Sequence, residues 1–112
     1  MANHVILIGR VGKDPFLTET DNGVKKVLFP VATNDGFYDK DGKWVDITNW
    51  HNCRAWRSVA DRCDKVVCKG DLISIVGMLS TERIDTDGKV IYKMYVDVKE
   101  FVVQEKFQKE DY

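Results

Sequence analysis

The middle of the chain decides the fold, and residues 48–79 read TNWHNCRAWRSVADRCDKVVCKGDLISIVGML. Side chains alternate in character over about 44–56, which is typical of a β-strand. From Ser58, an expected N-cap, the apolar residues recur at helical spacing, and this short helix is expected to close at Gly70 behind a basic residue. A further apolar stretch over 72–81 predicts the next strand. The pattern therefore predicts a strand, a short helix and a strand in succession.

The flanking segments predict three more strands. Residues 3–11 are a β-branched run bounded by glycine, and residues 24–33 alternate apolar and polar side chains around Pro30, which predicts an edge or a bulge because proline has no N–H. Residues 90–103 alternate again and follow a hairpin loop around Gly88. Five strands with one short helix between the third and fourth are the element order of an all-β OB-fold, a five-stranded Greek-key barrel.

Size and composition favour one small globular domain. The chain has 112 residues and 12.9 kDa, with 44% hydrophobic and 31% charged residues, which is ordinary for one folded unit. We expect the domain over 1–104 and a short charged tail over 105–112. The net charge of −1 creates no global basic field, so any site for a polyanion must be local. No apolar run is long enough to span a membrane, and the N-terminus has no export signal, so a cytoplasmic location is expected.

Cysteine and histidine do not predict a metal site, a cofactor or catalysis. The three cysteines are an odd number, which favours buried thiols in a reducing compartment. His51, Cys53, Cys63 and Cys68 lack the paired spacing of zinc ligands. No nucleophile, phosphate-loop or dinucleotide motif occurs, so the sequence does not predict an enzyme. A metal-dependent enzyme stays as a minor alternative that would require tightly bound zinc.

Aromatic side chains interleaved with cations are the strongest functional signal. Alternation places Trp50, Asn52, Arg54 and Trp56 on one face of the third strand, a composition that predicts an exposed platform. Unpaired bases stack on such rings while Lys and Arg contact the phosphates. The loop over 34–43 also carries aromatics that no periodicity buries. The remaining candidates for contact with single-stranded DNA are Phe37, Tyr38, Lys40, Trp44, Arg10, Lys26, Arg83, Lys93 and Tyr95.

The chain resembles the bacterial single-stranded DNA-binding proteins over about residues 3–104. The opening NHVILIGRVGKDP (3–15) is similar to the N-terminal strand and turn of that family. The segment Thr-Asn-Trp-His (48–51) resembles its Thr-Glu-Trp-His segment, and 60–79 is similar to its helix and fourth strand. The resemblance implies a non-enzymatic OB-fold that protects single-stranded DNA during replication, recombination and repair, associated with the bacterial nucleoid.

The resemblance also implies roles for individual residues. Phe37, Trp50 and Trp56 fall at stacking positions, and Lys40 and Arg83 at basic ones. The family assembles as a homotetramer, so a homotetramer or a dimer of dimers is expected here, and a set of residues is expected at subunit contacts: Asn3, Val5 and His51.

Several positions depart from the family pattern. Ile84 stands where many members have a stacking aromatic, and Asn52 replaces a usual cation. The acidic, Phe-ended tip of the family is absent where this sequence ends at Glu110-Asp111-Tyr112, so recruitment of repair enzymes through such a tip is not expected. These departures leave an alternative open, in which the chain is an OB-fold protein-interaction subunit of a replication or recombination complex.

Overall fold

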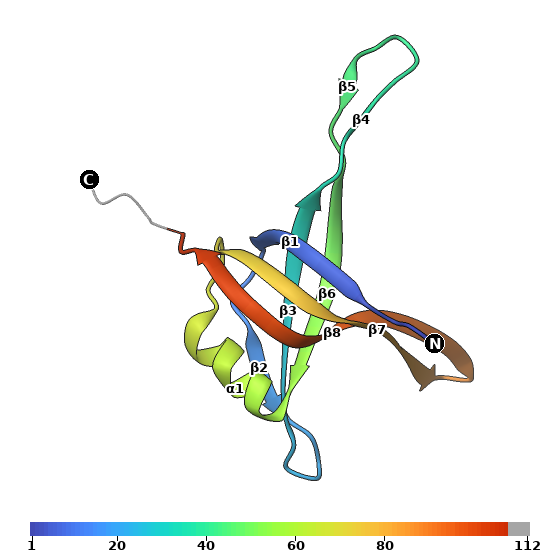
Figure 1. Ribbon diagram of the computed structural model, residues 1–112. Coiled ribbons are helices and arrows are strands. Elements are labelled where there is room, and N and C mark those ends of the chain that lie inside the picture. The colour runs from blue at the N-terminus through green and yellow to red at the C-terminus, as the bar shows by residue number, and fades with distance from the viewer. Residues whose placement is uncertain (108–112) are drawn as a thin grey trace.

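Five long strands wind into a barrel in the computed structural model, which describes residues 1–107 (Figure 1). They are β1 (Val5–Val11), β3 (Lys25–Asn34), β6 (Thr48–Trp56), β7 (Leu72–Thr86) and β8 (Lys89–Glu105). Their order is β1-β7-β8-β6-β3, and pairing of β1 with β3 closes the ring. One helix, α1 (Arg57–Val66), lies between the third and fourth of these strands. The predicted OB-fold is therefore confirmed.

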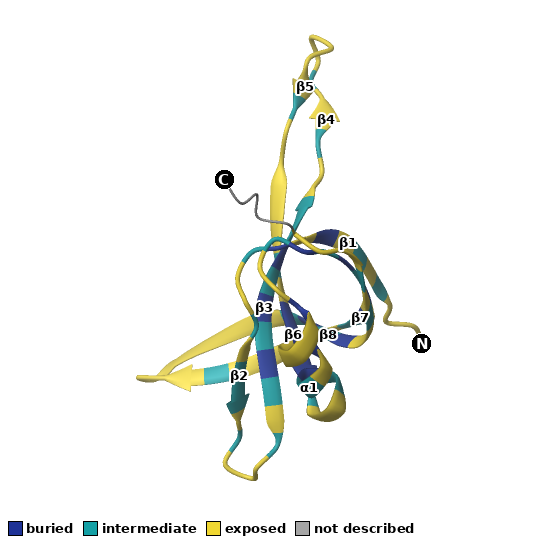
Figure 2. Ribbon diagram, turned by 90° about the vertical axis from the view of Figure 1, so that its left-hand side faces the viewer, coloured by how far each residue is buried: buried dark blue, intermediate teal, exposed yellow. Residues whose placement is uncertain are grey.

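The core of the barrel is built from alternate residues of the strands. Because successive side chains point to opposite faces, alternate residues of the two strands are buried between the walls (Figure 2): Val27, Phe29 and Val31 of β3, and Cys53 and Ala55 of β6. The helix adds Ala60 and Cys63 to the same cluster. The largest fully buried apolar side chains are those of Ile73, Ile75, Val27 and Val31. Because these residues point inward, the residues between them along each strand point to the outer face of the sheet.

Pro30 lies inside β3 at the point where the strand changes neighbours. Before Pro30, residues 25–28 of β3 pair with β2 (Phe16–Glu19), and after it residues 31–32 pair with β1. The Pro30 carbonyl accepts a hydrogen bond from the Gly12 amide at 2.9 Å. The N and O of one residue point to the same side of a strand, so the missing donor faces the junction between β1 and β2. Pro30 is thus tolerated without a bulge in the pairing with β6.

The register of β7 against β8 changes at Gly77. The shift falls between Val76 and Gly77, and a Cβ on Gly77 would collide with the backbone carbonyl of Asp97. Only glycine permits this close approach of the two strands.

Three short strands were not predicted. β2 follows the turn at Pro15, and β4 (Phe37–Tyr38) pairs with β5 (Trp44–Val45). The expected loop over 34–43 is therefore largely a hairpin arm, and the predicted strand over 44–56 is two strands, β5 and β6. The Asp39 carboxylate accepts hydrogen bonds from the amides of Asp41 and Lys43 at 2.9 and 2.8 Å. This side-chain turn closes the arm locally.

The helix bounds differ from the prediction. The N-cap is Trp56 and not Ser58, and no side chain caps the first turn. The helix ends at Val66, well before Gly70. Gly70 has a φ of +92°, but it serves a separate turn in which the Asp71 amide donates to the Cys68 carbonyl. Gly70 therefore adopts the left-handed conformation that a C-terminal glycine favours. The prediction that the helix closes there was wrong, because the helix ends at Val66.

The β7–β8 hairpin is longer than predicted and projects from the barrel (Figure 1). Pairing continues to Thr86 and Lys89, and the turn lies at the predicted place, formed by Asp87 and Gly88, which both have positive φ. Both faces of the projecting part are largely exposed. Residues 82–86, which extend the strand beyond its predicted end at 81, therefore lack the alternation that marks a half-buried strand.

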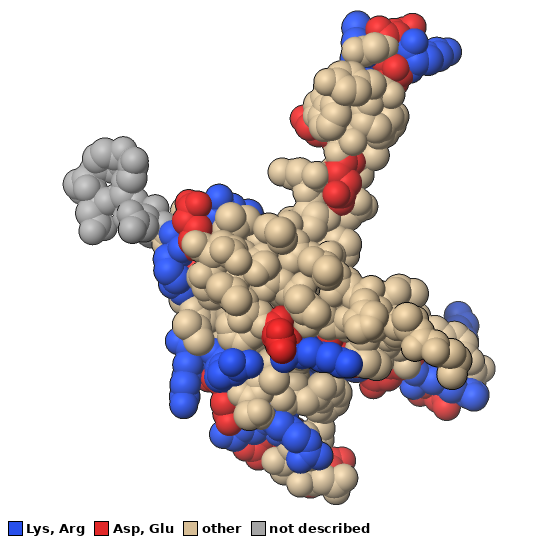
Figure 3. Space-filling view, viewed as in Figure 1, with Lys and Arg blue, Asp and Glu red and all other residues tan. Residues whose placement is uncertain are grey.

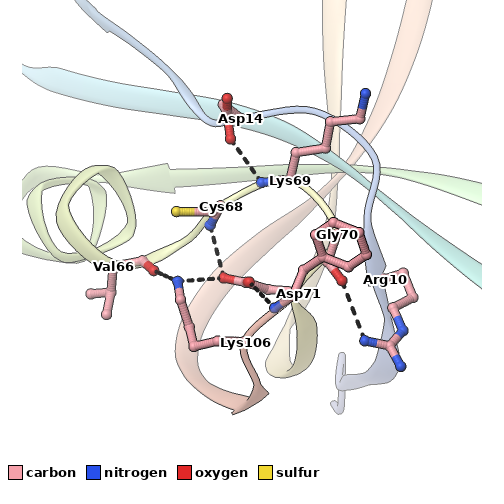
Figure 4. Close-up of polar contacts among 9 residues, drawn as sticks. Arg10, Asp14, Val66, Cys68, Lys69, Gly70, Asp71 and Lys106 are labelled. Atoms are coloured by element: carbon pink, nitrogen blue, oxygen red, sulfur yellow. Dashed lines mark hydrogen bonds and ion pairs between the residues drawn. The ribbon is translucent and has the colours of Figure 1, made fainter. Parts of the chain in front are cut away.

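The start of the expected tail is fixed to the barrel by a buried carboxylate. Asp71 is fully buried and accepts hydrogen bonds from the amides of Cys68 and Phe107 and from Lys106 Nζ, at 2.9, 3.0 and 2.7 Å (Figure 4). Burial alone would raise the pKa of Asp71, but these donors together hold it below its ordinary value. Residues 105–107 are thus ordered against the domain, and residues 108–112 lie outside the described part.

Candidate nucleic-acid interface

The outer face of β6 carries the aromatic platform that the alternation predicts. Trp50 is 60% exposed, and its ring lies beside Gly12, where a Cβ would collide with it. Asn52 is exposed and Trp56 is half-buried. The intervening Cys53 and Ala55 face the core. Two indole rings are therefore presented on one side of the barrel wall.

Arg54 lies on the same face but is not the exposed cation that the sequence predicts. It is buried, at 6% exposure. Its Nε and Nη2 donate to the two carboxylate oxygens of Asp97 at 2.8 and 3.3 Å, and Nη1 donates to Glu82 at 3.0 Å. Burial alone would lower the pKa of Arg54, but Asp97 and Glu82 outweigh that effect and raise it. The guanidinium is therefore charged and already neutralised, which argues against a role as a phosphate ligand.

Arg54 instead links two rings of the face. Its guanidinium carbon lies 4.2 Å from the ring centroid of Tyr95 and 5.1 Å from that of Trp56. Lys26 Nζ lies 5.7 Å from the Trp56 ring. Cations over aromatic faces stabilise such contacts by about 0.5 to 2 kcal/mol. The contacts restrict both rings and leave Lys26 as the accessible cation beside Trp56.

The β4–β5 arm separates a second group of candidates from the platform. The exposed side chains on it are those of Phe37, Tyr38, Lys40 and Trp44. The arm extends well away from the barrel (Figure 1), and the Tyr38 and Trp44 rings meet edge to face with centroids 5.0 Å apart. Thr33 and Asn49 donate to Asp35 at its base, which lowers the pKa of that carboxyl.

The remaining basic candidates do not gather at one place. Lys93 shares a face with Tyr95, because alternate residues of β8 point the same way. Arg83 pairs in register with Tyr92 and so lies on the opposite face of the β7–β8 ribbon, where it contacts Asp85. Arg10 donates to the Gly70 carbonyl at 3.3 Å, at the end of the barrel shown in Figure 4.

The three residues expected at subunit contacts have intramolecular partners. The Asn3 side chain donates to the Leu79 carbonyl at 2.8 Å and accepts from the Leu79 amide at 2.9 Å. Val5 packs against the core, and His51 Nε2 lies 2.9 Å from Thr33 Oγ1. Asn3 thus fastens the start of β1 to β7.

The cysteines are divided between the core and the surface. Cys53 and Cys63 are buried, as predicted, and burial raises the pKa of each thiol to about 12. Cys68 is exposed, so the prediction of three buried thiols was wrong there. Among residues 1–107 no group of three His, Cys, Asp or Glu side chains is arranged to hold a metal ion. No helix in the same range is long and apolar enough to cross a membrane.

A groove beside the platform was not predicted from the sequence. Phe16, 67% exposed on β2, lines a cavity of about 510 Å³ together with Lys13, Lys93 and Tyr95. The four-residue strand after the Asp-Pro turn was too short for its alternation to be recognised. The exposed ring directly after that turn was the available signal.

Comparison with known proteins agrees with this fold. A "Single-stranded DNA-binding protein 1" of Chlorobaculum tepidum is 41% identical over 93 residues, covering 83% of this chain and 57% of that protein. A "Single-stranded DNA-binding protein" of Bacteroides thetaiotaomicron is 37% identical over 105 residues, covering 89% of this chain and 65% of that protein. A solved structure described as "Plasmodium falciparum SSB complex with ssDNA" matches with a TM-score of 0.86 at 24% identity, covering 94% of this chain and 96% of that one.

The family model for the "Single-strand binding protein family" matches residues 2–104. The chain spans only about half the length of several curated relatives, for example 47% of the protein from Neisseria meningitidis. The matched residues include all five long strands except the end of β8. The chain belongs to the single-strand binding protein family.

Proposed function

We propose that this chain binds single-stranded DNA with little sequence preference and shields it during replication, recombination and repair. The observation that carries the proposal is the pair of indoles, Trp50 and Trp56, on one accessible face beside Lys26. Relatives that cover most of this chain are named for the same activity. This role requires no reaction, so the chain acts as a binding protein and not as an enzyme, and its place is the bacterial cytoplasm with the nucleoid.

Base stacking and phosphate neutralisation both contribute to the proposed binding. Every base has a π-face, so stacking on Trp50 and Trp56 tolerates any sequence and contributes about 1 to 3 kcal/mol per base. Exposed lysines then neutralise phosphates, which makes the affinity depend on salt. Phe37, Tyr38, Lys40 and Trp44 on the arm extend the same chemistry away from the barrel. Arg54 contacts the Trp56 and Tyr95 rings and restricts their orientation.

Tryptophan fluorescence during titration with oligo(dT) tests the proposal. We expect quenching by the single strand, weaker quenching at higher salt, and none by duplex DNA. Trp56→Ala is expected to weaken binding by about 1 to 3 kcal/mol, whereas Trp56→Phe, which keeps a ring, retains most of the affinity. If folded protein shows neither quenching nor retention of the strand, the aromatics belong to a protein interface instead.

We also propose that the chain assembles as a homotetramer. Ile6 and Ile8 on β1 are 72% and 62% exposed, and Val76 and Val102 continue the same outer face on β7 and β8. Figure 3 shows that the centre of this face carries few charged side chains. Contiguous exposed apolar surface of this kind marks an interface, and the identical patch on a second copy closes a dimer. The tetramer, in which two such dimers pair, rests on the resemblance to the family. A monomeric or dimeric mass in solution at micromolar concentration would contradict this assembly.

A further inference from the structure

A groove runs along the outer wall of the barrel beside the platform. Its two sides are Phe16 on β2 and Tyr95 on β8, and its floor includes Leu28, Pro30 and Asn52 on β3 and β6. The cavity of about 510 Å³ lies within the range of small-ligand sites. It is therefore large enough for a planar group between the two rings.

The two rings are presented differently. Phe16 is 67% exposed although it lies in a paired strand. Tyr95 is half-buried, and Arg54 lies 4.2 Å from its ring centroid. Because Arg54 is fixed by Asp97 and Glu82, the Tyr95 ring is held in place before any ligand arrives. Phe16 supplies an adaptable apolar surface opposite it.

The polar groups of the groove suit a nucleotide. Within residues 1–107 neither Lys13 nor Lys93 forms an ion pair, so both ammonium groups are available to a phosphate. The Asp14 carboxylate at the rim already accepts from the Lys69 amide at 2.7 Å (Figure 4). The exposed Asn52 amide offers one acceptor and two donors. Such an amide can pair with the edge of any base, which is compatible with binding without sequence preference.

We propose that the groove between Phe16 and Tyr95 holds an unpaired nucleobase of the bound strand, with Lys13 and Lys93 on the adjoining phosphates. This inference rests on the proposed single-stranded DNA binding and adds a base site to the Trp50–Trp56 platform. Asn52 and Pro30, in the floor of the groove, pair on neighbouring strands, and Asn52 lies two residues after Trp50 on the same face of β6, so the DNA strand can pass from Trp50 into the groove.

Photocrosslinking locates the base directly. The full-length chain is irradiated with an oligo(dT) carrying 5-iodouracil, and the adducts are mapped after trypsin digestion. Tryptic peptides 14–25 and 94–99 each contain one aromatic residue, Phe16 and Tyr95 respectively. Adducts on both peptides are expected. Adducts confined to the peptides that carry Trp50 and Trp56 would overturn the inference while leaving the proposed function intact.

Affinity measurements by fluorescence anisotropy provide the second test. Phe16→Ala is expected to weaken oligo(dT) binding at least about fivefold, the lower limit for loss of one stacked base. Phe16→Tyr is the matched control and keeps wild-type affinity. Because Phe16 is exposed, its truncation leaves the fold intact, so this pair decides the outcome even where Tyr95→Ala lowers stability. Wild-type affinity in Phe16→Ala would refute the groove as a base site.

The salt dependence separates the phosphate contacts from the stacking. Lys13→Gln and Lys93→Gln are each expected to reduce the slope of log affinity against log salt by about 0.7, the value for one phosphate on a single strand. Lys65→Gln, on α1, is the control and leaves the slope unchanged. If the slopes of Lys13→Gln and Lys93→Gln equal the slopes of the unmodified chain and of Lys65→Gln, the proposed phosphate contacts of Lys13 and Lys93 are refuted. Failure of the unmodified chain to bind oligo(dT) would instead refute the proposed function itself.

Discussion

Replacing Arg54 with leucine tests whether its buried guanidinium stabilises the fold. Arg54 makes two hydrogen bonds to Asp97, one to Glu82 and one to Ser80. Without Arg54, the Asp97 side chain, which is only 19% exposed in the native structure, has no counter-charge, whereas the Glu82 side chain is already 47% exposed and stays hydrated. Breaking a buried ion pair from one side costs about 3 to 5 kcal/mol. We expect the lower end, about 3 kcal/mol, because Asp97 is partly hydrated.

A second variant separates the charge from the packing. Arg54→Leu combined with Asp97→Leu removes both charges, and apolar replacement of a buried pair is often neutral. The double variant is therefore expected to regain most of the lost stability. The control is Arg62→Leu, because Arg62 is also an arginine over a ring, 5.3 Å from the Phe101 centroid, but is exposed. It should lose less than about 1 kcal/mol.

Denaturant unfolding followed by circular dichroism measures these differences, at one fixed protein concentration because the proposed assembly contributes to stability. A loss below about 1 kcal/mol in Arg54→Leu would refute the buried-pair reasoning. The double variant should also retain the wild-type salt slope for oligo(dT), since Arg54 is held by Asp97 and Glu82 and is not available to a phosphate. A slope reduced by about 0.7 would show that Arg54 does contact the strand.

Two further predictions concern the thiols and the fixed C-terminal segment. Of the three cysteines only exposed Cys68 should react rapidly with a thiol reagent near neutral pH, because burial raises the pKa of Cys53 and Cys63 to about 12; labelling of more than one thiol in native protein, measured by mass spectrometry, would contradict this. Asp71→Asn should lower stability near neutral pH, and because the folded-state pKa of Asp71 is depressed, its contribution is present above about pH 4 and is lost as pH falls through the folded value. Unfolding curves should therefore converge in acid, and an undiminished difference at about pH 2 would argue against the carboxylate.

The elements that carry a local signal were predictable. The change from period two to helical spacing between Trp56 and Ala60 marks the junction of β6 and α1 in the sequence itself. Alternation likewise identified the outward face of Trp50 and Trp56, because backbone geometry alone fixes which side a residue points to. The ends of α1 were not predictable, since Ser58 and Gly70 satisfy capping patterns that the fold uses otherwise.

Exposure and charge state on that face were decided by contacts distant in sequence. By its strand position Arg54 should be a free cation, yet it is buried because β8 brings Asp97 beside it, 43 residues away. The resemblance predicts that Arg83 contacts the single-stranded DNA. The register of β7 with β8 instead places Arg83 on the opposite face of the hairpin from Tyr95.

The sequence by itself determined the order of the elements, the OB-fold and the outward position of the two indoles, because these depend on periodicity along the chain. Only the tertiary structure decided which cations remain free and where the groove lies. Phe16 and Tyr95 are 79 residues apart in sequence, and barrel closure places them around one cavity. The hydration of a side chain and its ion pairs depend on the residues packed around it, and strand pairing between segments distant in sequence determines which residues those are.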